Sequence, residues 1–156
     1  IYSFMSRFNC NYKSRHSKAT IFTLEGVSQY ITKDALQSTL QEIGELTKNS
    51  DTTFFMSYVD KRLKDAPKDC FGKGYRNAEK KAKTVQYLSA KVGEPWISLY
   101  SQEDIKELLD EFGFTLIENK CLKNLNSVYF GPLGRKLPEN EIFNLEHFAV
   151  AKKKQS

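Results

Sequence analysis

The residues of this sequence that could serve ligand chemistry lie where short apolar runs end. Glu25 follows the run Thr20–Leu24, and Asp60 follows the β-rich run Thr52–Val59. A short uncharged run that stops at an acidic residue and then at Gly26 predicts an interior strand of a parallel sheet. Ligands of such sheets bind at the carboxyl ends of the strands. A buried strand whose next residue happens to be acidic would give the same spacing, so both interpretations stay open.

Aromatic residues lie near these strand ends. Tyr30 lies in the loop after Glu25, and Tyr58 lies at the end of the second run. Trp96 is the only tryptophan and follows the helix-breaking residues 93–95. An indole ring is usually buried packing, but on a loop it can also form the wall of a pocket. These three aromatic residues are therefore candidates for a binding site.

The segments around these strands have the apolar spacing of amphipathic helices. A helix between the first two strands makes them parallel neighbours. The strands predicted at 114–121 and 146–152 have no helix pattern between them, which favours antiparallel pairing. The three predicted helices span residues 33–48, 77–92 and 101–112.

The composition is that of one ordinary globular domain. A length of 156 residues, a hydrophobic fraction of 40% and a charged fraction of 28% all fit this class. No run approaches the roughly 18 apolar residues of a membrane-spanning helix. The first residue is Ile1 and no secretory signal pattern follows, which we interpret as an interior start. Three separated cysteines without a CxxC pair favour a reducing, cytoplasmic setting.

The net charge of +5 raises the question of an anionic partner. In and before the predicted helix 77–92, the basic residues mostly lie opposite the apolar stripe of Ala78, Ala82, Val85 and Leu88. At helical spacing this distribution predicts a solvated face, and it makes nucleic acid an unfavoured partner. The basic residues are Lys73, Arg76, Lys80, Lys81, Lys83 and Lys91.

The sequence lacks the common motifs of nucleotide binding, acyl transfer and metal hydrolysis. His16 and His147 are the only histidines. His147 falls in an apolar strand, where a histidine is more often a hydrogen-bonded structural residue than a ligand. The residue pattern therefore assigns neither a metal site nor a catalytic residue.

Four segments together resemble the carboxyl-terminal half of a class I S-adenosylmethionine-dependent methyltransferase, of the group related to leucine carboxyl methyltransferases and bacterial O-methyltransferases. The first segment reads TIFTLEGVSQYITKDALQSTLQEIGEL and the third reads GEPWISLYSQEDIKELLDEFGF. Together the segments cover a little under half of the chain, in the right order. They span residues 20–46, 50–60, 93–114 and 145–153.

This resemblance implies an α/β fold with a Rossmann-like, mostly parallel sheet, an antiparallel last strand and helices on both faces. The strands at 20, 52, 114 and 146 would be the fourth to seventh of a seven-stranded sheet. The family's glycine-rich cofactor loop lies upstream of everything present here. We therefore expect residues 1–156 to be a single domain that forms the acceptor-side half of a larger methyltransferase domain. A further segment would complete it, or the chain would self-associate through the exposed strand edge.

The activity implied by the resemblance is S-adenosylmethionine-dependent O-methyl transfer to a small-molecule carboxylate or hydroxyl. Glu25 and Gly26 would border the cofactor, and Tyr30, Tyr58 and Trp96 would contact the substrate. A carboxylate acceptor is ionised near pH 7 and needs no general base, whereas a hydroxyl needs one. No residue clearly fills that role, which favours a carboxylate acceptor or a base from the absent part.

Two other functions also fit the sequence. The near rival is methylation of a protein carboxyl terminus, which a long acceptor groove rather than a closed pocket under residues 61–92 would favour. The other is a non-catalytic module that binds a polyanion through the basic face of helix 77–92. Steeply salt-dependent binding would be its signature.

Overall fold

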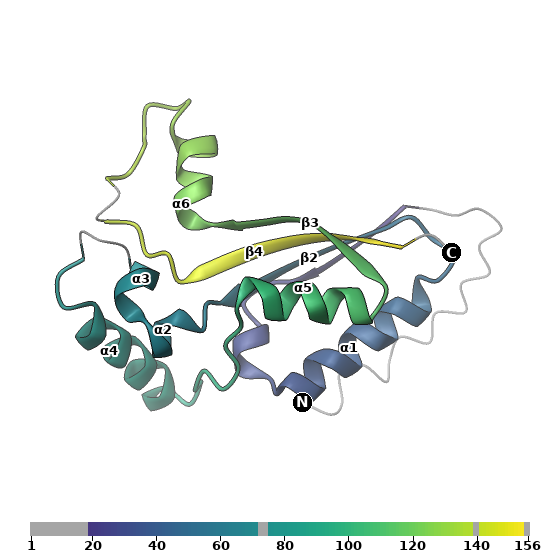
Figure 1. Cartoon of the computed structure of the whole chain (residues 1–156), viewed down its shortest axis with the longest axis horizontal. Coiled ribbons are helices and arrows are strands. Elements are labelled where there is room, and N and C mark those ends of the chain that lie inside the picture. The colour runs from purple at the N-terminus through teal and green to yellow at the C-terminus, as the bar shows by residue number, and fades with distance from the viewer. Residues whose placement is uncertain (1–18, 72–74, 139–140, 155–156) are drawn as a thin grey trace.

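The computed structural model describes residues 19–71, 75–138 and 141–154 (Figure 1). His16 and Lys73 lie outside the described residues. None of the described helices has the length and apolarity to cross a membrane. The elements are β1 (Thr20–Leu24), η2 (Ser28–Tyr30), α1 (Lys33–Leu46), β2 (Thr52–Val59), α2 (Arg62–Asp65), α3 (Pro67–Phe71), α4 (Ala78–Lys91), α5 (Gln102–Glu111), β3 (Phe114–Cys121), α6 (Leu122–Leu125), η3 (Asn126–Phe130) and β4 (Glu146–Lys153).

The strands form one mixed sheet with the order β1-β2-β4-β3. β1 and β2 run parallel, and β4 runs antiparallel to both β2 and β3. Since β1, β2 and β3 point in one direction, their carboxyl ends lie at the same end of the sheet as the start of β4. We call this the carboxyl end of the sheet, and it is defined by Leu24, Val59, Cys121 and Glu146. The α/β fold with an inserted antiparallel last strand is thus confirmed.

Helices α1 and α5 pack on one face of the sheet and enclose the main core (Figure 1). Their apolar stripes follow the helical spacing that the sequence shows. On the strands, alternate residues of β2 point into this core while the residues between them point to the other face. The core side chains include Leu36, Leu40, Ile43, Phe54, Met56, Tyr58, Ile105, Leu109 and Phe114.

Both helices begin at the residues that the sequence predicts. The Thr32 hydroxyl accepts a hydrogen bond from the backbone N–H of Ala35 at 3.2 Å, at the start of α1. At the start of α5 the Ser101 hydroxyl accepts from the N–H of Asp104 at 3.0 Å, and the Asp104 carboxylate accepts from the N–H of Ser101 at 2.8 Å. These caps satisfy backbone donors that have no partner within the helix, which is why the helices begin there.

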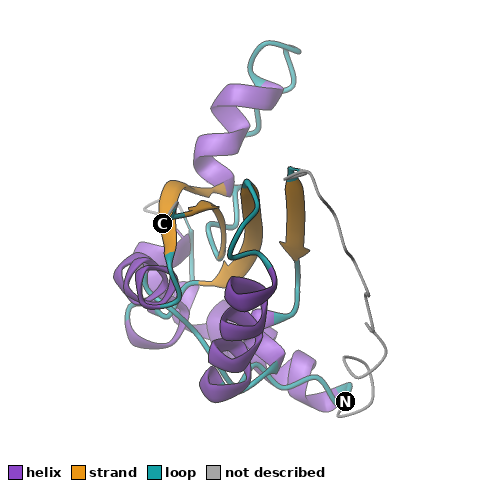
Figure 2. Cartoon of the chain, turned by 90° about the vertical axis from the view of Figure 1, so that its right-hand side faces the viewer, coloured by secondary structure: helices purple, strands orange, loops and turns teal. Residues whose placement is uncertain are grey.

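The sequence predicts that β1 is an interior strand of the larger fold and that this chain alone exposes its edge. Within the described residues it pairs only with β2, and Figure 2 shows it as the outermost strand. Ile21 is 73% exposed, and Thr23, on the same face, is also exposed. Apolar residues on both faces indicate a strand covered on both sides, but no described helix covers the face of β1 that carries Ile21.

α4 also packs differently from the prediction. Ala78 and Ala82 are buried against a second cluster that includes Leu63 and Phe71. Leu88, expected on the buried stripe, is instead 52% exposed. The apolar spacing correctly predicts a helix, but its stripe is fully buried only at Ala78 and Ala82, while Val85 is half-buried.

Candidate functional site

A buried serine fixes the turn after β1 to the neighbouring strand. Gly26 donates its backbone N–H to Oγ of Ser57 at 2.9 Å, and the Ser28 hydroxyl donates to the carbonyl oxygen of Ser57 at 2.8 Å. Ser28 and Ser57 are both buried. Gly26 has a φ of +64°, in the left-handed region that favours glycine. These contacts hold the end of β1, and with it Glu25, in a set position relative to β2.

A second segment, residues 96–100, bridges this turn and the end of β2. The backbone N–H of Ile97 donates to the carbonyl oxygen of Gln29 at 2.8 Å. Further along, the N–H of Tyr100 donates to the carbonyl oxygen of Val59 at 3.0 Å. The segment therefore runs along the carboxyl end of the sheet, where ligands of open α/β folds bind.

Four of the five predicted site residues lie on these two segments. Glu25 and Gly26 are exposed at the turn, and Tyr30 is half-buried at the end of η2. Trp96 is half-buried at the start of the second segment and packs against the cluster under α4. The structure thus brings these four residues to one region, while their contacts with a cofactor or a substrate stay predictions.

Tyr58, the fifth predicted site residue, lies in the core. It is 1% exposed, and its hydroxyl is hydrogen-bonded to the side-chain amide of Asn119 at 2.7 and 3.0 Å. Burial raises the pKa of Tyr58 well above its usual range, although the hydrogen bond to Asn119 acts in the opposite direction. The described structure gives Tyr58 a packing role, and its contact with a substrate stays a prediction.

Asp60, directly after β2, is a buried carboxylate in contact with the side chains of His147 and Arg62. Its Oδ2 lies 3.0 Å from Nε2 of His147 and accepts a hydrogen bond from Nε of Arg62 at 2.9 Å. Burial opposes ionisation of Asp60, but the hydrogen bonds from His147 and Arg62 outweigh it and hold the pKa of this carboxyl well below its usual range. His147 therefore has the structural role that the sequence predicts, because it ties β4 to the end of β2.

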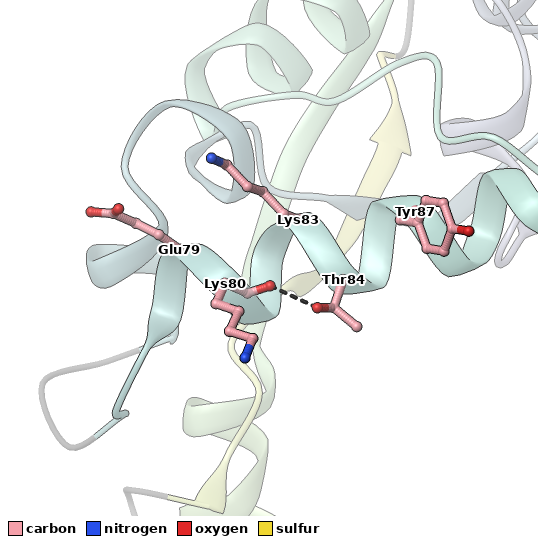
Figure 3. Close-up of a pocket in the computed structure, with 5 residues that line it drawn as sticks. All are labelled: Glu79, Lys80, Lys83, Thr84 and Tyr87. Atoms are coloured by element: carbon pink, nitrogen blue, oxygen red, sulfur yellow. Dashed lines mark hydrogen bonds between the residues drawn. The ribbon is translucent and has the colours of Figure 1, made fainter.

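A shallow hollow lies on the outer face of α4 (Figure 3). The side chains around it project from successive turns of this one helix, so it has no second wall. None of them belongs to the turn after β1 or to residues 96–100. The hollow is lined by Glu79, Lys80, Lys83, Thr84 and Tyr87.

Comparison by sequence finds no match, either to a family model or to a curated protein. Comparison by structure finds proteins with a similar fold. A DUF574 family protein from Streptomyces avermitilis overlaps with 87% of this chain, at a TM-score of 0.55 and 12% identity. A possible exported protein from Bordetella parapertussis overlaps with 86% of this chain, at a TM-score of 0.54 and 15% identity. At such identities the likeness shows the fold alone.

The chain spans less than half the length of these proteins, 45% of the first and 38% of the second. Two methyltransferases overlap less closely. Magnesium protoporphyrin IX methyltransferase from Synechocystis PCC 6803, with bound SAH, gives a TM-score of 0.45 and 9% identity over 86% of this chain and 44% of its own. The 1,6-didemethyltoxoflavin-N1-methyltransferase from Burkholderia thailandensis gives 0.48 and 14% over the same shares. These two likenesses are too weak to carry a conclusion.

Sequence reasoning did not identify Ser57 or Gln29 as part of this region. Ser57 is a polar residue inside the apolar run of β2, and a polar side chain in a buried strand needs a hydrogen-bond partner. The position of Ser57 in this run could therefore have indicated a hydrogen bond to a neighbouring segment. Nothing in the local sequence indicates that Gln29 is buried. Among the described residues, no three histidine, cysteine, aspartate or glutamate side chains come together as metal ligands.

Proposed function

We propose that this chain is the acceptor-side part of an S-adenosylmethionine-dependent O-methyltransferase that acts on a small-molecule carboxylate or hydroxyl. The observation that carries the proposal is the sheet order, with β4 inserted antiparallel between β2 and β3. This is the arrangement that the sequence resemblance implies. Since a fold hosts many functions, the proposal also depends on the turn after β1.

That turn has the properties that a nucleoside ligand needs. The exposed carboxylate of Glu25 can accept hydrogen bonds from amino or hydroxyl groups, or complement a sulfonium charge. A Cβ at Gly26 would meet no atom within 4 Å, so the backbone there is open to close approach by a ligand. S-adenosylmethionine held at this turn would supply an activated methyl group. The chain's own task is to position the acceptor, and positioning is a large part of catalysis in such a displacement.

The acceptor side of the site would be formed by Tyr30 and Trp96, which lie on the two segments joined at Gln29. A carboxylate acceptor is ionised near pH 7, so its oxygen can attack a methyl carbon without a general base. A hydroxyl would require a base, and no described residue of the turn has been assigned that role. The proposal therefore favours a carboxylate.

Calorimetry with S-adenosylmethionine tests the cofactor side of this proposal in a protein that carries the complete fold. Glu25→Gln should weaken binding by about 1 to 3 kcal/mol, because a charge-assisted hydrogen bond is lost. Glu42→Gln, on the exposed face of α1, is the matched control and should bind as the unmodified protein does. An unchanged affinity in Glu25→Gln would remove this residue from the site.

We also propose that further polypeptide completes the sheet by pairing with β1. Support comes from the position of β1 as the outermost described strand, and from the 73% exposure of Ile21 on it. An uncharged edge strand without proline is a template for another strand. The 156-residue chain alone should therefore associate in solution, as measured by light scattering. A stable, monodisperse monomer would count against this part of the proposal.

A second candidate function is polyanion binding by α4. It is favoured by Lys80, Lys83 and Tyr87, whose side chains surround the hollow on the outer face of this helix (Figure 3). Lysines with an interleaved aromatic ring suit phosphate-bearing partners. Binding to heparin or to a single-stranded oligonucleotide that falls steeply with salt, and is lost in Lys80→Glu with Lys83→Glu, would support it. No binding at low salt would exclude it.

A further inference from the structure

We propose that Gln29 and Trp96 form a hydrogen-bonding wall of the acceptor site. In this proposal Gln29 accepts a hydrogen bond from an N–H or O–H of the ligand, and Trp96 donates one to a neighbouring carbonyl or carboxylate oxygen. This inference rests on the proposed function in one respect, the identification of the ligand as a methyl acceptor. The binding of a ligand by Gln29 and Trp96 does not depend on it.

The two residues are held on segments that are bonded directly to each other. The carbonyl oxygen of Gln29 accepts from the backbone N–H groups of Ile97 and Ser98, at 2.8 and 3.3 Å. The Ser98 hydroxyl donates to the carbonyl oxygen of Ile31 at 2.7 Å. Since these bonds flank both residues, the backbone at Gln29 and at Trp96 is set before any ligand binds, which lowers the entropic cost of binding.

One side-chain polar atom of each residue is buried without a partner. Gln29 is 6% exposed, and its Oε1 has no hydrogen-bond partner among the described residues. The Nε1 of Trp96 is likewise buried and unpartnered within the described chain. Buried polar side-chain atoms are nearly always hydrogen-bonded in proteins, so each exception requires an explanation. Four such atoms occur among the described residues. Nε2 of His147 lies 3.0 Å from Asp60, and the hydroxyl of Tyr100 belongs to the main core. The other two are one acceptor and one donor, on neighbouring segments.

These atoms define the chemistry of the ligand. A group that satisfies both must carry a donor next to an acceptor, as an amide N–H does beside its carbonyl, or as a hydroxyl does beside a carboxylate. A ligand without the donor would leave Oε1 of Gln29 unpaired, and sites built around a hydrogen bond discriminate strongly against such analogues.

The test compares N-methylbenzamide, which has an N–H beside its carbonyl, with N,N-dimethylbenzamide, which lacks the N–H. Trp96 is the only tryptophan of the 156-residue chain, so its fluorescence reports binding at this site. We expect N-methylbenzamide to bind about tenfold more tightly. Gln29→Met should bring the two affinities together, whereas Gln41→Met, on the exposed face of α1, should keep the preference. Trp96→Phe should weaken both probes by a similar factor, measured by ligand-observed NMR.

Melting temperature provides a second readout that does not depend on the choice of probe. Replacing an unpaired buried amide by an apolar side chain of similar shape is neutral or stabilising. Gln29→Met should therefore melt at or above the temperature of the unmodified chain. A clearly lower melting temperature, or a preference for N-methylbenzamide that survives the substitution, would overturn the inference. Intact probe binding in a complete protein that transfers no methyl group would instead count against the proposed function alone.

Discussion

The imidazole Nε2 of His147 lies 3.0 Å from the carboxylate Oδ2 of Asp60, and both side chains are almost wholly buried. Asp60 directly follows β2 and His147 lies at the start of β4, so this contact fastens the inserted strand at the carboxyl end of the sheet. The ring of Tyr58 stacks on the imidazole, with 5.3 Å between the ring centroids. Removal of one partner from a buried pair destabilises the fold, because it leaves the other buried group unpaired.

Asp60→Asn should therefore lower the free energy of unfolding by about 3 kcal/mol, because it leaves the buried His147 without its charged partner. Urea unfolding at neutral pH measures this loss. Asp51→Asn is the control: Asp51 lies 3.6 Å from Lys152 on the surface, and an exposed pair contributes less than about 1 kcal/mol. If both variants lose the same free energy of unfolding, the buried pair contributes no more to stability than the exposed one.

The pH dependence of stability should follow from the same carboxylate. The pKa of Asp60 in the folded chain lies below its ordinary value of 3.8. As the pH falls, the unfolded chain therefore takes up the proton first, and the stability that the ionised carboxylate contributes declines below that value. The difference in unfolding free energy between the unmodified chain and Asp60→Asn should shrink as the pH falls from about 5 to about 3. A difference that stays constant over this range would contradict the assignment.

Ser57→Ala should loosen the turn after β1. The N–H of Gly26 would lose its acceptor, at a cost of about 1 kcal/mol, and its amide hydrogen should exchange about fivefold faster. Hydrogen exchange followed by NMR measures this at a single residue. Ser38→Ala, which removes a hydroxyl bonded within α1, should leave the exchange of Gly26 unchanged. If the amide hydrogen of Gly26 also exchanges at an unchanged rate in Ser57→Ala, the turn does not depend on Ser57.

Substitutions of Gly26 should separate backbone strain from side-chain crowding. The φ of +64° disfavours any residue with a Cβ, but no atom lies within 4 Å of where that Cβ would be. Gly26→Ala should therefore cost about 1 kcal/mol from strain alone. Gly26→Asn should cost less, because asparagine tolerates the left-handed region. Chemical denaturation measures both, and an equal loss in the two variants would indicate that something other than φ is responsible.

Much of the local structure could be predicted from the sequence. Thr32 and Ser101 each lie directly before a helix, and each helix has an apolar stripe with the expected spacing. The parallel pairing of β1 with β2 follows from the helix between them, and the antiparallel pairing of β3 with β4 follows from the lack of one. The signals for these features lie within a few residues or within one connection, so no distant contact is needed to interpret them.

The sequence by itself thus determined where the helices and strands lie, how consecutive strands pair, and that Glu25 and Gly26 follow a strand. Only the tertiary structure decided that Ile21 on β1 is exposed, that Tyr58 is buried, and that Asp60 meets His147. The reason is physical. Caps and apolar periods act between neighbours in the chain, whereas burial and the pairing of polar groups depend on which distant segments the strand register brings together.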